Sequence, residues 1–193
     1  MTGRRRMMVG IVSGIVIITE ILLLVRANQN KPLNYGDYAE LIVSSPSFVN
    51  GMIPVEFTGD GEDKSPELVL ENISEEAVSI AVIMDDLDHP IRGYNHWVIW
   101  NIPPQNVIPE GITHGATVEE MGSALQGIGY GRHRYRGPKP PFGSHRYQFH
   151  VFVLDTMLDL NADAYKKDLL AAMDGHILQY GSVTGSYPGV KVN

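Results

Sequence analysis

Residues 137–154 read GPKPPFGSHRYQFHVFVL, and this stretch does most to decide the fold. Its first part is dense in proline and glycine, which restrict and bend the backbone, so we expect a rigid loop that ends near Ser144. From Arg146 to Leu154 apolar and polar residues alternate before a continuous apolar run, the pattern of a strand that enters a buried sheet. A shaped loop that leads into a buried strand is a frequent position for binding residues.

Four further segments carry clear secondary-structure patterns. Short strands are expected at Leu41–Val43 and Met52–Phe57, with turn-forming residues between them. The uninterrupted apolar run Ser79–Met84 predicts a strand buried on both faces, and His96–Ile102 predicts another, stopped by Pro103. The segments therefore indicate a sheet-rich domain.

The rest of the domain is expected to be mostly loop, with one helix. Residues 105–144 are rich in glycine and proline, and a loop of this length is usually functional. Ala162–Met173 is the one convincing helix of the domain, with Asn161 as its N-cap and Gly175 just beyond its C-terminus. This inventory, mostly β with one C-terminal helix, fits a single β-sandwich or barrel-like domain.

The N-terminus predicts a membrane segment at residues 1–27. Met7–Val25 is a nearly unbroken apolar run that would span roughly 28 Å as a helix, close to a bilayer core. Three arginines at positions 4–6 favour a cytoplasmic N-terminus and a domain outside the membrane. We favour a retained signal anchor because the run exceeds a usual signal-peptide core. A signal peptide cleaved after Ala27, giving a secreted protein, and a buried helix of a soluble protein are the alternatives.

Composition narrows the class of partner. We expect a linker at residues 28–38 after the anchor, followed by a single domain at residues 39–193. Removing residues 1–27 from a chain of net charge −7 leaves 11 basic and 21 acidic residues. Such an acidic domain would repel phosphate backbones, so nucleic acid is not an expected partner. The chain has no cysteine, which excludes disulfides, thiolate catalysis and thiolate metal sites.

Polar residues gather where loops meet the predicted strands. Asp85–Pro90 follows one buried strand, Asn95 and His96 open the next, and His145 stands at the end of the proline-rich loop. Each feature alone has a structural explanation, because acidic residues after a strand commonly form turns. If the segments converge, however, the imidazoles can donate to an anion while a carboxylate orients one of them.

Three motifs resemble a known family. Asp86-Leu87-Asp88-His89-Pro90 is similar to a D-P-D-x-P signature, and residues 96–103 (HWVIWNIP) are similar to a strand that begins with His and ends in N-I-P. Residues 137–147 (GPKPPFGSHRY) resemble a G-x-x-P-P-x-G-x-H-R-Y motif. The family is that of the phosphatidylethanolamine-binding proteins, in its prokaryotic Raf-kinase-inhibitor-like branch. The resemblance covers roughly residues 40–187 and implies a β-sandwich with a C-terminal helix and a pocket at one end.

The resemblance also implies a set of site residues. The polar pocket groups are Asp86, His96, His145 and Tyr147, and Tyr94 forms the aromatic wall. Pro90 and Pro140 shape the rim, and Gly137 lets the backbone approach a ligand. Two departures from the family pattern bear on them. Leu87 replaces a proline, so the loop is expected to be less rigid and Asp85 competes with Asp86 for the pocket. Tyr94 replaces a frequent tryptophan.

The function that this site implies is binding without catalysis. The ligand would be a small anion, such as a phosphate ester or a phospholipid headgroup, with no cofactor and no metal. A role as inhibitor of a protein such as a protease or a kinase, acting through the pocket rim, is a further expectation. The alternative is a hydrolase or metal-dependent enzyme that uses Asp86, His96 and His145. A structural surface protein with a vestigial pocket is the third reading.

Overall fold

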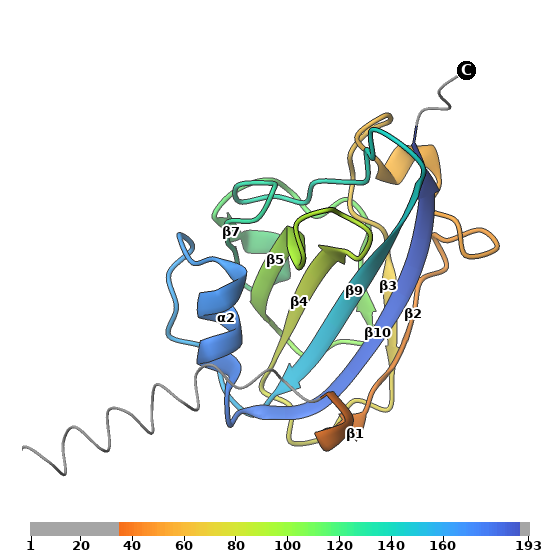
Figure 1. The fold of residues 1–193 in the computed structure, drawn as a ribbon. Coiled ribbons are helices and arrows are strands. Elements are labelled where there is room, and N and C mark those ends of the chain that lie inside the picture. The colour runs from red at the N-terminus through yellow and green to blue at the C-terminus, as the bar shows by residue number, and fades with distance from the viewer. Residues whose placement is uncertain (1–34, 190–193) are drawn as a thin grey trace, which may run out of the picture. The chain divides into compact units, whose positions relative to one another are not determined.

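Three of the predicted strands form the centre of a seven-stranded sheet. In the computed structural model, which describes residues 35–189, they are β4 (Ser79–Asp86), β5 (Tyr94–Ile102) and β9 (Ser144–Leu154) (Figure 1). β4 lies between β5 and β9 and pairs antiparallel with both. All residues of β4 are buried, which confirms the expectation of a strand covered on both faces.

The remaining elements extend this sheet and add a second one. The large sheet has the order β1-β10-β9-β4-β5-β8-β7, and the small one has the order β2-β3-β6. Their other strands are β1 (Ala39–Glu40), β2 (Ile42–Ser44), β3 (Leu68–Glu71), β6 (Val107–Ile108), β7 (Thr117–Val118), β8 (Ala124–Gln126) and β10 (Ile177–Pro188). The helices are the 3-10 turns η1 (Tyr35–Asp37), η2 (Val55–Phe57) and η3 (Glu119–Met121), and α2 (Lys166–Met173).

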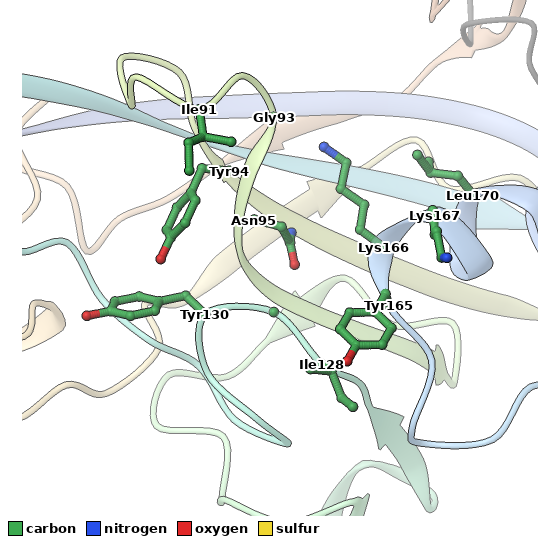
Figure 2. A pocket seen from close by; sticks show the side chains of 11 residues that line it. Ile91, Gly93, Tyr94, Asn95, Ile128, Tyr130, Tyr165, Lys166, Lys167 and Leu170 are labelled. Carbon is green, nitrogen blue, oxygen red and sulfur yellow. The ribbon is translucent and has the colours of Figure 1, made fainter.

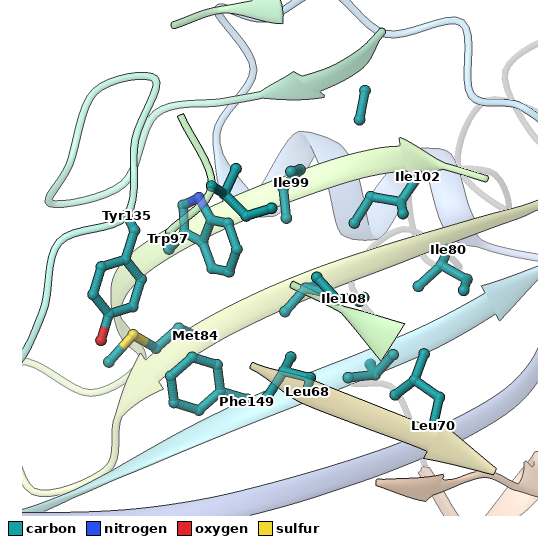
Figure 3. Close-up of a cluster of buried hydrophobic side chains, with 14 of the residues drawn as sticks. Leu68, Leu70, Ile80, Met84, Trp97, Ile99, Ile102, Ile108, Tyr135 and Phe149 are labelled. Carbon is teal, nitrogen blue, oxygen red and sulfur yellow. The ribbon is translucent and has the colours of Figure 1, made fainter. Parts of the chain in front are cut away.

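The hydrophobic core lies between the two sheets. Leu68 and Leu70 of β3 and Ile108 of β6 belong to one cluster of buried side chains with residues of β4, β5 and β9 (Figure 3). Among the partners on the large sheet are Met84 and Phe149, both fully buried. Apolar area removed from water at this contact is the main stabilising contribution to the fold. The fold is therefore mostly β with one C-terminal helix, as expected.

The other face of the large sheet is the one against which α2 lies (Figure 1). Trp100 and Phe152 are fully buried although they lie outside the inter-sheet cluster, and Leu169 and Met173 of α2 are fully buried as well. An ion pair between Lys166, at the start of α2, and Asp85, near the end of β4, ties the helix to this face.

The predicted helix boundary at Ala162 is wrong. Asn161 does accept a hydrogen bond from a following backbone N–H, that of Asp163 at 2.9 Å, but it caps only a turn. The chain then extends at Tyr165 (φ −94°, ψ 169°), and α2 starts at Lys166. Gly175 has a φ of +81°, so glycine suits the turn that follows the helix.

Two other expectations need correction. Met52–Phe57 is not a strand: Val49 and Met52 pair across a tight turn, and η2 follows after Pro54. Residues 105–144 are not only loop, because they contribute β6, β7 and β8. The segment is held by Gln126, whose side chain accepts the indole N–H of Trp97 at 2.7 Å and donates to the carbonyl of Thr113 at 2.8 Å.

The predicted anchor or signal peptide at residues 1–27 lies outside the described residues, as does all of the predicted linker except residues 35–38. Between residues 35 and 189, no helix has the length and apolar character needed to cross a bilayer.

Candidate functional site

Strand alternation separates the two candidate carboxylates at the end of β4. In the pairing of β4 with β9, Asp86 lies opposite Tyr147 and Asp85 lies opposite Gln148. Because side chains alternate along a strand, the two acidic side chains point to opposite faces of the sheet. Asp85 turns toward α2, where it pairs with Lys166 and accepts a hydrogen bond from Asn95. Asp86 is therefore the carboxylate on the face that carries Tyr147.

An irregularity in β5 brings His96 to that same face. Met84 pairs with Trp97 and Asp85 with Asn95, so His96 is an extra residue opposite β4, which is the arrangement of a β-bulge. Without the bulge, alternation would place His96 on the face opposite Trp97. Because the extra residue shifts the alternation, both Tyr94 and His96 reach the cavity that Asp86 lines.

The cavity at this end of the sheet has a volume of about 150 Å³. It is lined by Asp86, His89, Tyr94, His96, Tyr130, Lys139, Pro140, Pro141, His145 and Tyr147. Six of the eight residues named from the sequence are thus brought together. The other two, Pro90 and Gly137, do not line it.

Two of the three cavity histidines, His96 and His145, are fixed by protein acceptors at one ring nitrogen. His96 Nδ1 lies 2.7 Å from the carbonyl oxygen of Arg136, and His145 Nδ1 lies 2.8 Å from Asp86 Oδ2. Because a carbonyl and a carboxylate can only accept, both Nδ1 atoms carry hydrogen, and Nε2 is the ring nitrogen left for a ligand. Burial lowers the pKa of His96 from its usual value of 6.5, so a neutral His96 offers a lone pair at Nε2.

The Asp86 carboxylate is held on both of its oxygens. Oδ2 accepts from His145, and Oδ1 accepts the backbone N–H of Asp88 at 2.9 Å. Tyr147 beside it is fully buried, and burial together with the negative charge of Asp86 raises the pKa of its phenol well above the usual value. Tyr147 therefore stays a neutral phenol, and its ring stands edge-on to that of His96 at 5.2 Å between centroids.

The loop after β4 is fastened to the start of β9. Arg146 donates to Asp88 from Nε at 2.9 Å and from Nη2 at 2.8 Å, and its backbone N–H adds a third bond at 2.8 Å. These bonds lower the pKa of Asp88 to about 2. Leu87 also contributes, because its N–H donates to the carbonyl of Arg146 at 2.9 Å, a bond that a proline cannot make.

A partly buried carboxylate, that of Asp63, supports the segment that orients His96. Asp63 accepts from the backbone N–H of Gly137 at 2.6 Å and from the guanidinium of Arg136 at 2.8 Å. The carbonyl of Arg136 is the acceptor that orients His96. A Cβ on Gly137 would lie 2.5 Å from the carbonyl oxygen of Phe57, so this glycine allows a close approach between two protein segments.

The geometry and the motifs agree with a comparison to known proteins. A family model described as phosphatidylethanolamine-binding protein matches residues 44–188. The chain belongs to the phosphatidylethanolamine-binding protein family. A UPF0098 protein of Pyrococcus abyssi is 44% identical over 156 residues, covering 79% of this chain and 88% of that protein. A UPF0098 protein of Aquifex aeolicus is 41% identical over 150 residues, covering 75% and 86%.

Solved structures of the same family have a similar fold. A phosphatidylethanolamine-binding protein homologue from Chlamydia trachomatis superposes with a TM-score of 0.68 at 31% identity, covering 78% of this chain and 99% of that one. Escherichia coli YbcL, described as a member of the mammalian family, gives a TM-score of 0.68 at 25% identity, covering 79% and 100%.

Four lining residues of this family member were not among those named from the sequence. His89, Lys139 and Pro141 lie inside the recognised motifs, so their positions in these motifs could have identified them as lining residues. His89 stacks on Tyr94 with 3.8 Å between ring centroids. Tyr130 comes from a glycine-rich turn within residues 127–131, for which the sequence carried no distinguishing pattern.

The geometry of the described residues also bears on the alternative of a metal centre. Across residues 35–189, no group of three or more His, Asp or Glu side chains is arranged to hold a metal ion. In the set named from the sequence, Asp86 with His96 and His145, the imidazole Nδ1 atoms are directed to a carbonyl and to the carboxylate itself.

Proposed function

We propose that this protein binds a small anionic group, as in a phosphate ester or a phospholipid headgroup, in the cavity between Asp86, His96 and His145. The observation that carries the proposal is the fixed orientation of the two imidazoles. Each commits Nδ1–H to a protein acceptor and leaves Nε2 for a ligand. Once protonated, both rings become charged donors, and such bonds to an anion are about twice as strong as neutral ones.

The size and charge of the cavity support the same proposal. A volume of about 150 Å³ is several times the share of one water molecule in the liquid, enough for a phosphate group. Asp86 would repel an anion if it were bare, but its two oxygens already accept from His145 and from the backbone N–H of Asp88. A protonated His145 then stands between the carboxylate and the ligand.

We propose a binding role and not an enzymatic one. Ser144, the hydroxyl next to His145 in sequence, is exposed and does not line the cavity, so it is not placed as a nucleophile for that imidazole. Inhibition of a protein such as a protease or a kinase would follow from a partner that covers the cavity rim. We also propose that residues 7–25 anchor the chain, with the domain outside the membrane. Fractionation with intact-mass measurement tests this, because a protein lacking residues 1–27 would refute the anchor.

Calorimetric titration of the full-length protein with inorganic phosphate and O-phosphoethanolamine tests the binding role. Saturable binding to the wild type and its loss in His145→Ala are expected. His176→Ala is the matched control, because His176 also pairs with a carboxylate, Asp155, at 2.8 Å but lies outside the cavity. Equal binding by His145→Ala and the wild type would refute the assignment. Phosphate binding that requires added Zn²⁺ would favour the metal-dependent alternative.

A further inference from the structure

A larger groove adjoins the proposed anion cavity. Its volume is about 710 Å³, within the range typical of small-molecule sites. It is formed by the loop before β5, the turn at residues 128–130 and the first turns of α2 (Figure 2). Tyr94 and Tyr130 line both hollows, so a ligand held in the cavity can continue past these two rings into the groove.

The walls of the groove are mainly apolar and aromatic. Ile91 is 65% exposed, Tyr165 is 52% exposed and Tyr130 is 50% exposed, which is unusual for large apolar side chains gathered on one surface. Figure 2 shows the rings of Tyr94, Tyr130 and Tyr165 arranged around the groove, with Leu170 of α2 at its far side. Covering these side chains with an apolar group would remove them from water.

The charge of the groove is complementary to an anionic ligand. Lys166 is neutralised by Asp85 on the sheet below it. Lys167, by contrast, forms no ion pair with an acidic residue of the described chain, and it lines the groove from α2, beside Leu170 (Figure 2). In a domain with an excess of acidic residues, this leaves a local positive charge beside the anion cavity.

From this juxtaposition we infer that the ligand is a phosphate monoester with an apolar group, the phosphate lying in the cavity and the apolar group in the groove. The inference rests on the proposed function and narrows the ligand class. Inorganic phosphate or a short polar ester would fill the cavity and leave the groove open. An aromatic group can pack on the tyrosine rings, and an alkyl chain can cover the same surface without ring contacts.

The test compares esters of equal charge by calorimetry on the full-length protein. Glycerol 1-phosphate reports the cavity alone, 1-naphthyl phosphate adds an aromatic group, and hexyl phosphate adds an alkyl chain. We expect at least one of the two apolar esters to bind about tenfold more tightly than glycerol 1-phosphate, the gain from burying about 60 Å² of apolar surface. A gain for naphthyl phosphate alone identifies an aromatic ligand, and a gain for both identifies apolar groups in general.

Groove variants then locate the effect. Tyr165→Ala and Ile91→Ser remove exposed side chains, so both should fold, and each should weaken the favoured ester about fivefold while changing glycerol 1-phosphate less than twofold. Phe142→Ala is the matched control, because Phe142 is 66% exposed and lines neither hollow. Equal affinity for all three esters would overturn the inference and leave the proposed function standing. Failure of every ester and of inorganic phosphate to bind would overturn the proposed function itself.

Discussion

Binding of sulfate to this protein should tighten as the pH falls, because of how His96 is held. Its Nδ1–H donates to the Arg136 carbonyl, so Nε2 can donate to an anion only after the ring takes up a proton. Sulfate is the informative probe, since it keeps its charge between about pH 8 and about pH 5.5 and has no hydrogen to donate. Any pH dependence of its binding then belongs to the protein.

The sign and the size follow from the pKa of His96. Burial lowers this pKa below 6.5, and a bound anion raises it, so binding above the free pKa requires proton uptake. The affinity for sulfate is greatest below the pKa of His96 in the free protein. It falls as the pH rises from there toward the higher pKa that His96 has in the complex, and one proton allows a fall of at most about tenfold per pH unit. A hydrogen bond to a charged group contributes about 1.5–3 kcal/mol. The total tightening is therefore about 10-fold to about 150-fold.

Calorimetry of the full-length protein at a series of pH values measures this directly. The net proton uptake is obtained by repeating the titration in buffers of different ionisation enthalpy. In His96→Gln, an amide that does not titrate replaces the imidazole, and the part of the slope due to this proton should disappear. Sulfate affinity that is the same at about pH 8 and about pH 5.5 would refute the reasoning, as would an unchanged slope in His96→Gln.

Three further predictions concern the supports of the site. Gly137→Ala should destabilise the fold by about 1–3 kcal/mol in urea unfolding, because its Cβ would overlap a neighbouring carbonyl; a variant as stable as the wild type would contradict this close packing. Gln126→Leu should cost about 1–3 kcal/mol by leaving the buried Trp97 indole without its acceptor, and unchanged thermal unfolding would count against that role. Asp88→Asn should lower stability by about 1 kcal/mol at neutral pH, since solvent screens its pair with Arg146. Because the pKa of Asp88 is lowered to about 2, that difference should shrink as the pH falls from about 4 toward 2, and a difference independent of pH would be inconsistent with the ion pair.

The centre of the fold was predictable because its strands carry strong local patterns. The apolar run Ser79–Met84 is typical of a strand buried on both faces, and the segment that starts at His96 is bounded by Pro103. The convergence of the polar segments follows from the antiparallel pairing of β4 with β5 and β9, which brings the end of one strand beside the starts of its two neighbours. The choice between Asp85 and Asp86, however, needed the register.

The parts that escaped prediction depend on tertiary contacts. Nothing in the sequence around His96 marks the bulge that turns this side chain toward the cavity, because a bulge is defined by the partner strand. Asn161 has the chemistry of a helix cap, yet the chain uses it for a separate turn before α2. β10 was not predicted as a strand, since its glycines weaken the pattern; Gly181 is required where the chain passes the carbonyl of Leu41.

Assigned imidazole NMR signals of the full-length protein, followed during titration with inorganic phosphate at about pH 6.5, test the central claim most directly. The claim is that His96 and His145 together hold an anion. It predicts that the ring signals of these two residues shift with one common dissociation constant, while those of His150, beneath α2, and His176 stay unchanged. Signals of His96 and His145 that remain fixed at saturating phosphate would contradict it.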